Sequence, residues 1–201
     1  DDTDLGVPAA FIRTSAGTAD QWWALCGAVL FKNTAGASPM SSNFVQDAIA
    51  TGDGTPTDLT AISSDMVEFE GALIVSSPTD LHRLASASWD KGWWITTLAQ
   101  SGLTTGIAHP LHISLKTNIL CIGDGNKLHT VDKNNNVKAS RVILPTEFEI
   151  IWIRSSYEGV WIGARNKKMR EAKVFFWDES AENYNKGYGL KDEMTFAGII
   201  K

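Results

Sequence analysis

Short apolar runs separated by polar clusters recur along the chain in a fixed order. Three stretches, 66–98, 113–144 and 151–190, each contain four apolar runs joined by turns, and the middle turn is rich in Gly, Asp or Asn. Runs of Val, Ile, Phe and Trp bounded by such turn residues predict β-strands. Aligning the third runs places Leu81, Leu128 and Val174 in register, with separations of 47 and 46 residues.

A more divergent unit precedes these three. It reads "AAFIRTSAGTADQWWALCGAVLFKNTAG" and continues as a loop-like stretch to about Thr60. Within that stretch, residues 42–52 combine a Ser, spaced apolar residues and a final Gly, so a short helix is an alternative there. The predicted units therefore span residues 9–60, 61–108, 109–147 and 148–192, and residues 193–201 begin a further strand. All four units are assigned to a single domain, 1–201.

Units of roughly 40 to 50 residues with four short antiparallel strands are typical of a β-propeller. We therefore predict an all-β, propeller-like array of about four four-stranded antiparallel blades. A β-sandwich with regular strand spacing is the competing architecture. The adjacent pairs Trp22-Trp23 and Trp93-Trp94 indicate strands that are covered on both faces. Because the chain starts without Met and its last residues begin another strand, we expect either a segment of a larger ring or a four-bladed ring with irregular ends.

The stretch "SASWDKGWW", residues 86–94, resembles the Asp-box turn of sialidases and related propeller proteins. That family pattern is Ser-x-Asp-x-Gly-x-Thr-Trp. Ser88, Asp90 and Gly92 match it, whereas Trp94 stands in place of Thr and Ile95 in place of the aromatic residue. The resemblance implies a stabilised hairpin between the third and fourth strands, away from any catalytic centre. Ligand contact by Trp93 or Trp94 is the functional alternative.

Two other turns are candidate binding sites. In "VDKNNNVK", Asp132, Asn134 and Asn136 alternate as the oxygen ligands of a calcium loop do. The loop lacks the expected Gly and the bidentate Glu, so a solvated hairpin tip is the alternative to calcium. The segment "RNKKMREAK" is interpreted as an insertion between the second and third strands of the last unit. It is a candidate surface for anionic partners, and the residues proposed to bind are Arg165, Lys167, Lys168 and Arg170.

Histidine and cysteine positions indicate structural roles. His82 and His129 each follow an aligned leucine, so we expect them to have the same structural role in successive units. Cys26 and Cys121 lie in apolar runs without the spacing of a metal site, and each is predicted to be a buried small side chain. A disulfide or a catalytic thiol is the alternative.

Composition narrows the function. A net charge of −5 and a pI of about 5.3 argue against general nucleic-acid binding, and no apolar run is long enough to span a membrane. Nucleophile elbows, phosphate-binding loops, dinucleotide fingerprints and the HExxH motif are missing. We therefore predict a non-enzymatic structural or recognition module that contacts proteins or glycans within a larger assembly, in a virion or at a cell surface. One alternative is a sialidase-like or other glycan-acting hydrolase, and another is a propeller domain that binds a small ligand or a metal.

Overall fold

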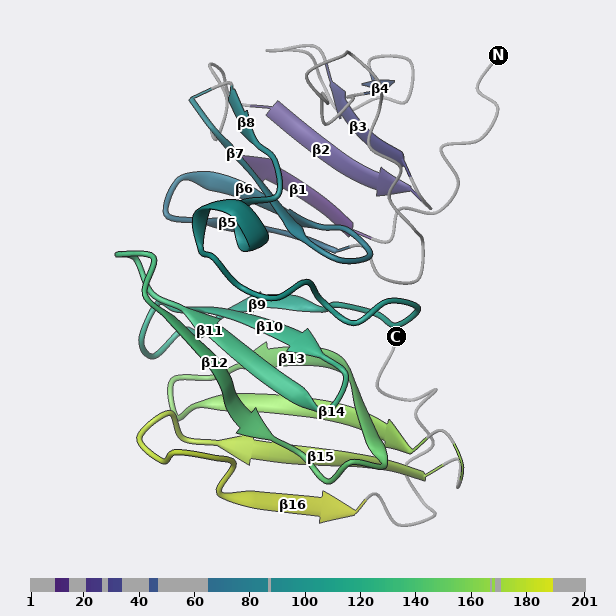
Figure 1. Cartoon of the computed structure of the whole chain (residues 1–201), viewed down its shortest axis with the longest axis vertical. Helices are drawn as coiled ribbons and strands as arrows, with labels where there is room; N and C mark the ends of the chain where they lie inside the picture. The colour runs from purple at the N-terminus through teal and green to yellow at the C-terminus, as the bar shows by residue number, and fades with distance from the viewer. Residues whose placement is uncertain are drawn as a thin grey trace. The chain divides into compact units, whose positions relative to one another are not determined.

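The computed structural model of the chain describes residues 10–14, 21–26, 29–33, 44–46, 65–86, 88–166, 168 and 171–189. Within these ranges it is built from four antiparallel sheets of four strands each (Figure 1). The chain divides into two compact units, Asp1–His109 and Pro110–Lys201, and two of the sheets belong to each unit. In every sheet the strands lie side by side in chain order.

The first unit contains two such meanders. One sheet consists of β1 (Ala10–Thr14), β2 (Gln21–Cys26), β3 (Val29–Asn33) and β4 (Phe44–Gln46). The other consists of β5 (Met66–Phe69), β6 (Ala72–Ser76), β7 (Leu81–Ala85) and β8 (Ser88–Asp90), followed by the π-helical turn η2 (Trp93–Thr97). The tight β5–β6 hairpin is closed by Glu70 and Gly71, whose φ angles of 49° and 69° are the positive values that a two-residue hairpin turn favours.

The second unit repeats this arrangement. One sheet consists of β9 (Leu111–Ile113), β10 (Leu120–Asp124), β11 (Lys127–Val131) and β12 (Val137–Ile143). The other consists of β13 (Phe148–Ser155), β14 (Val160–Asn166), β15 (Glu171–Trp177) and β16 (Lys186–Gly189). β13, the first strand of its sheet, contacts β9 and β10, and the Ile150 amide donates to the Gly125 carbonyl at 2.8 Å. In the first unit, β1 likewise contacts β5.

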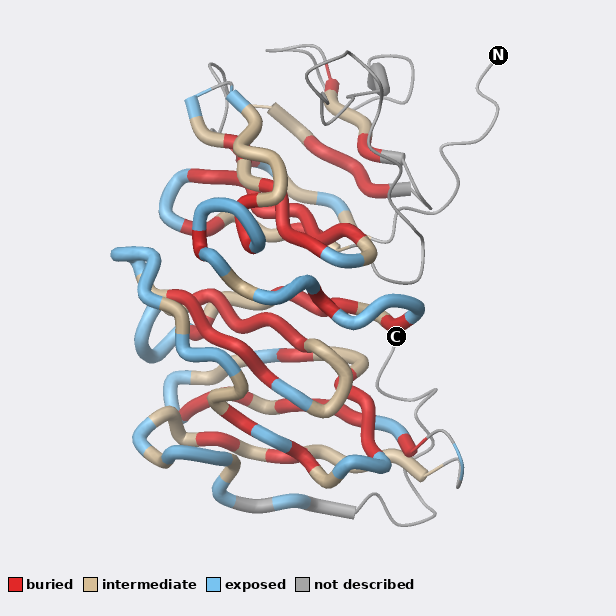
Figure 2. Tube along the Cα trace, in the orientation of Figure 1, coloured by how far each residue is buried: buried red, intermediate tan, exposed pale blue. Residues whose placement is uncertain are grey.

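Hydrophobic residues between the sheets hold each unit together. In the first unit, Trp23 and Leu25 of β2 pack with Leu73 and Val75 of β6. In the second, residues of β10 to β12 pack with residues of β13 to β15 around Trp177. All five residues of β6 are buried, as are the first four of β10, so these second strands are covered on both faces (Figure 2). Burial on both faces explains why their sequences are continuously apolar rather than alternating.

The predicted second and third strands are confirmed in all three aligned units. The aligned residues Leu81, Leu128 and Val174 lie on the third strands β7, β11 and β15. The short helix considered for residues 42–52 is wrong at Phe44–Gln46, which pair with Phe31–Asn33 of β3 as strand β4. The ladder to β3 provides the backbone partners that a helix would have provided internally. The other residues of 42–52, and the further strand expected at 193–201, lie outside the described residues.

The basic "insertion" of the last unit is mostly strand. β14 and β15 are each seven residues long, and they pair from Val160 and Trp177 to Asn166 and Glu171. Only residues 167–170 connect them. Arg165 therefore lies in a strand, and the loop expected there is replaced by the end of an extended hairpin.

Gly159 allows the β13–β14 turn to approach the backbone at the end of β15 closely. A Cβ atom added there would lie 2.3 Å from the Trp177 carbonyl oxygen and 2.8 Å from the Asp178 Cα. Because both atoms belong to the backbone, the conflict cannot be relieved by a rotamer change. We expect Gly159→Ala to lower the free energy of unfolding by about 2 kcal/mol in chemical denaturation.

Gly71→Ala is the matched control, because nothing lies within 4 Å of its added Cβ and only its positive φ resists substitution. That variant should lose about 1 kcal/mol. Equal losses in the two variants would show that the close approach at Gly159 does not constrain the fold.

Candidate functional site

The stretch 86–94 is built differently from the hairpin corner expected of it. Ser88 and Asp90 lie within the fourth strand β8, and Gly92, with a φ of 64°, begins the π-helical turn η2. Trp93 and Trp94 lie in that turn rather than on a strand, and they are 1% and 2% exposed. The structure thus gives both tryptophans a packing role, with no open ring face.

Asp80, not the Asp-box-like Asp90, organises this turn. The buried Oδ1 of Asp80 accepts hydrogen bonds from the backbone amides of Leu81 at 2.7 Å, Trp94 at 3.1 Å and Ile95 at 3.2 Å. Burial raises the pKa of this carboxyl, and the three amides oppose the rise. Asp90 is half-buried and accepts a hydrogen bond from the Thr97 hydroxyl at 2.9 Å.

The two aligned histidines share one structural role, in agreement with the sequence. The Nδ1 atom of His82 accepts the amide of Gly92 at 3.1 Å, and that of His129 accepts the amide of Ser140 at 2.9 Å. Both side chains are buried on third strands. The partner of His82 comes just after the fourth strand β8, and the partner of His129 lies in the fourth strand β12. Burial, with Lys91 as a smaller contribution, lowers the pKa of His82 to about 4.

The basic segment is only partly described. Arg165 is exposed, and its Nε lies 3.4 Å from Oε2 of the buried Glu149. Lys168 is exposed, and its backbone amide donates to the Asn166 side chain at 3.0 Å. Lys167 and Arg170 lie outside the described residues. The proposed anionic partner of this segment stays a prediction.

The candidate calcium loop is a closed turn between β11 and β12. Oδ1 of Asp132 accepts the backbone amides of Asn134 and Asn136, and Oδ2 accepts the Asn136 side-chain amide at 2.8 Å. These hydrogen bonds, those from Asn136 foremost, lower the pKa of Asp132. Because the Asn136 side chain donates to Asp132, the two side chains do not converge as oxygen ligands. Across the described ranges, no group of three or more His, Cys, Asp or Glu side chains is arranged to hold a metal ion.

Cys121 is fully buried and unpaired, as predicted for a small core side chain, and burial raises the pKa of its thiol. The side chain of Cys26 is not among the described parts of the chain.

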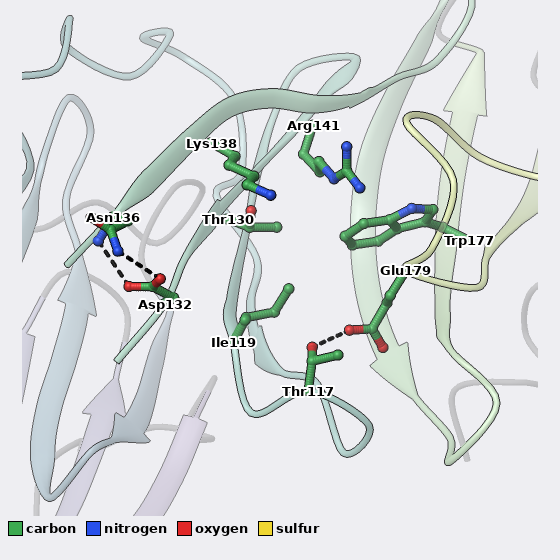
Figure 3. A pocket seen from close by; sticks show the side chains of 9 residues that line it. All are labelled: Thr117, Ile119, Thr130, Asp132, Asn136, Lys138, Arg141, Trp177 and Glu179. Atoms are coloured by element: carbon green, nitrogen blue, oxygen red, sulfur yellow. Dashed lines mark hydrogen bonds between the residues drawn. The ribbon is translucent and has the colours of Figure 1, made fainter. Parts of the chain in front are cut away.

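A pocket in the second unit brings together residues that lie far apart in the sequence. It has a volume of about 250 Å³ and lies between the sheets of β9–β12 and β13–β16 (Figure 3). We call it the Arg141 pocket. It is lined by Thr117, Ile119, Thr130, Asp132, Asn136, Lys138, Arg141, Trp177 and Glu179.

Trp177 forms the buried wall of the Arg141 pocket. It is 1% exposed, and its Nε1 donates to the Ala181 carbonyl at 3.0 Å. The guanidinium carbon of Arg141 lies 5.4 Å from the centre of the indole ring, which is within cation–π range. Figure 3 shows Arg141 and Lys138 reaching from β12 toward the space in front of this wall. The indole thereby holds one cation in place.

Glu179 lies beside Trp177 in the pocket lining and has a constrained backbone conformation (Figure 3). Its φ is 68°, a value that non-glycine residues rarely adopt. Its Oε1 accepts the Ser114 hydroxyl at 2.6 Å, and its Oε2 accepts the Thr117 hydroxyl. These two bonds to the β9–β10 connection fix the carboxylate at the rim. Backbone strain of this kind often marks a functional site.

Sequence reasoning found Asp132 and Asn136 but missed Arg141, Trp177 and Glu179. The missed residues lie on β12, at the end of β15 and just after it, and only the packing of two sheets brings them together. A visible signal was the acidic turn "WDESAENYNKG" in the position equivalent to "VDKNNNVK" one unit earlier. Repeat-equivalent turns fall at the same end of neighbouring sheets.

In the ranges that the structure describes, no helix has the length and apolar character that a membrane span requires. No protein-family model matches the sequence, and a search of curated proteins finds no match either.

Proposed function

We propose that the chain is a β-propeller-type recognition module without a catalytic role, which contacts glycans or proteins within a larger assembly such as a virion or a cell-surface structure. The observation that carries this proposal is the repeated four-stranded meander. In both units the first strand of one sheet contacts the first strand of the next, β1 with β5 and β9 with β13. Propeller blades pack in this way, with their first strands innermost.

The strand order favours blades over a sandwich. Sandwiches of the immunoglobulin type move the chain between sheets by Greek-key connections. Here each sheet is completed in chain order before the next begins. A four-stranded sheet cannot bury both of its faces alone, and the two-sided burial of β6 and β10 fits blades that need neighbours.

The pKa of Asp132 and the hydrogen bonds of Glu179 favour recognition over hydrolysis in this pocket. A glycosidase needs a general acid whose pKa is raised, together with a second carboxylate. Hydrogen bonds lower the pKa of Asp132 instead. Glu179 is engaged through both oxygens by Ser114 and Thr117. This pair suits a fixed binding rim better than a proton-transfer site.

Retention on immobilised polysaccharides, combined with an assay for new reducing ends, tests the proposal. The panel should contain acidic and neutral polysaccharides, and the full 201-residue chain should be applied to each. We expect retention on at least one of them and no release of reducing ends during prolonged incubation. Release of reducing ends would support the hydrolase alternative, and retention on none would remove the glycan-binding role.

A further inference from the structure

We infer that the Arg141 pocket binds a hexuronate residue, the carboxylate-bearing sugar unit of an acidic polysaccharide. This inference rests on the proposed recognition function and assigns its ligand class. It follows from the presence of both cationic donors and carboxylate acceptors in the lining of one pocket.

The pocket lining includes two cationic side chains that donate no hydrogen bond to a described residue. Among the residues that the structure describes, Arg141 makes only its cation–π contact with Trp177, and Lys138 donates no hydrogen bond. A guanidinium has five N–H groups in a planar fork, and an ammonium has three. Both groups extend into the pocket from β12 (Figure 3). The fork of Arg141 matches a carboxylate, and Lys138, which also interacts electrostatically with Asp132, adds a second positive charge to the lining.

The pocket lining also includes carboxylates, and one of them can accept further hydrogen bonds. An ionised carboxylate has about four lone-pair sites. Glu179 uses one on each oxygen, for Ser114 and Thr117, so both oxygens can still accept hydrogen bonds. Asp132 accepts three hydrogen bonds within its turn. A ligand group that reaches either carboxylate must therefore bring neutral donors, and hydroxyl groups are such donors.

The size and the charge distribution favour a sugar acid over other anions. A pocket of about 250 Å³ lies just below the ~300 Å³ at which pockets for drug-sized ligands begin, so it suits a single ring. Phosphate would bring additional negative charge against Asp132 and Glu179 and would leave much of the volume empty. An acidic peptide side chain would satisfy the cations but bring no hydroxyl groups to Glu179. A hexuronate has a carboxylate at one end of the ring and hydroxyls around it.

Calorimetric titration of the full chain with D-glucuronate, D-glucose, inorganic phosphate and a Glu-Glu dipeptide tests the inference. We expect glucuronate to bind at least tenfold more tightly than each of the other three. Arg141→Met and Lys138→Ala should each weaken glucuronate binding about tenfold or more, as expected for the loss of a charged hydrogen bond. The side chain of Lys138 is exposed and makes no hydrogen bond to a described residue, so its replacement should not affect folding.

Two matched controls keep the charge change but lie outside the pocket. Lys133→Ala removes an exposed lysine from the same β11–β12 turn. Arg83→Met removes the corresponding arginine over a tryptophan in the first unit, 6.0 Å from the Trp93 ring centre. Both should bind glucuronate as the unaltered chain does.

The inference is overturned if glucose, phosphate or the dipeptide binds as tightly as glucuronate, or if the pocket variants bind no more weakly than the controls. Absence of glucuronate binding in a chain that is retained on a polysaccharide would overturn the pocket assignment and leave the recognition function standing.

Discussion

Asp80→Ala will lower the free energy of unfolding by about 3 kcal/mol, because it leaves buried backbone amides without their acceptor. The carboxylate of Asp80 binds Leu81 at the start of β7 and both Trp94 and Ile95 in η2. Its loss should loosen η2 and expose Trp94, which is now 2% exposed. Denaturation curves and a red shift of tryptophan emission measure the two effects.

Two companion variants separate hydrogen bonding from charge. Asp80→Asn keeps an oxygen acceptor and should lose less than about 1 kcal/mol at pH 7. Burial raises the pKa of Asp80 in the folded chain above its unfolded value of 3.8. Its contribution to stability is therefore complete below that value and is lost as pH rises through the folded pKa. Asp80→Asn should remove this pH dependence.

Asp90→Ala is the control at the residue that matches the Asp-box pattern. Asp90 is half-buried and has one hydroxyl donor, so we expect a loss of less than about 1 kcal/mol. If Asp90→Ala lowers the free energy of unfolding more than Asp80→Ala does, then Asp90, the residue that matches the Asp-box pattern, stabilises this turn and Asp80 does not.

His82 will make the chain sensitive to mild acid. Its Nδ1 must stay unprotonated to accept the Gly92 amide, and burial lowers its pKa from 6.5 to about 4. A group whose folded pKa is depressed contributes stability that is complete above the unfolded pKa and lost as pH falls through the folded pKa. The stability is therefore lost between pH 6.5 and pH 4, and lowering the pKa from 6.5 to about 4 corresponds to about 3 kcal/mol.

The measurement compares denaturant titrations at pH 7 and pH 4 for the unaltered chain and for His82→Asn. Other titrating groups are common to both proteins and cancel in the difference. The variant should lose about 3 kcal/mol less than the unaltered chain between the two pH values. Equal losses would mean that His82 is not held neutral by its surroundings.

The sequence predicted the strands well where apolar runs and turn residues coincide. The second strands β6, β10 and β14 and the aligned third strands fall where the periodicity placed them. β4 was missed because it is only three residues long and its partner strand supplies its hydrogen bonds. Only the outer end of the β14–β15 hairpin was missed, because its Lys and Arg residues are also typical of a charged loop.

The candidate site was predicted only in part, for a different reason. Asp132 and Asn136 belong to a local turn, and the short segment VDKNNNVK is enough to predict it. Arg141, Trp177 and Glu179 become neighbours of that turn only when two sheets pack together. Similarly, Asp80 rather than Asp90 organises the turn because η2 folds back so that the Trp94 amide reaches the Asp80 carboxylate. A motif match along the sequence carries no information about that contact.

A crystal structure of the full chain tests the propeller proposal most directly. If the four sheets are blades, the first strands β1, β5, β9 and β13 will line one common axis, and β16 will lie at the outer edge of its blade. A β-sandwich would contradict the proposal: the sheets would then face each other in two layers, with the first strands at opposite edges.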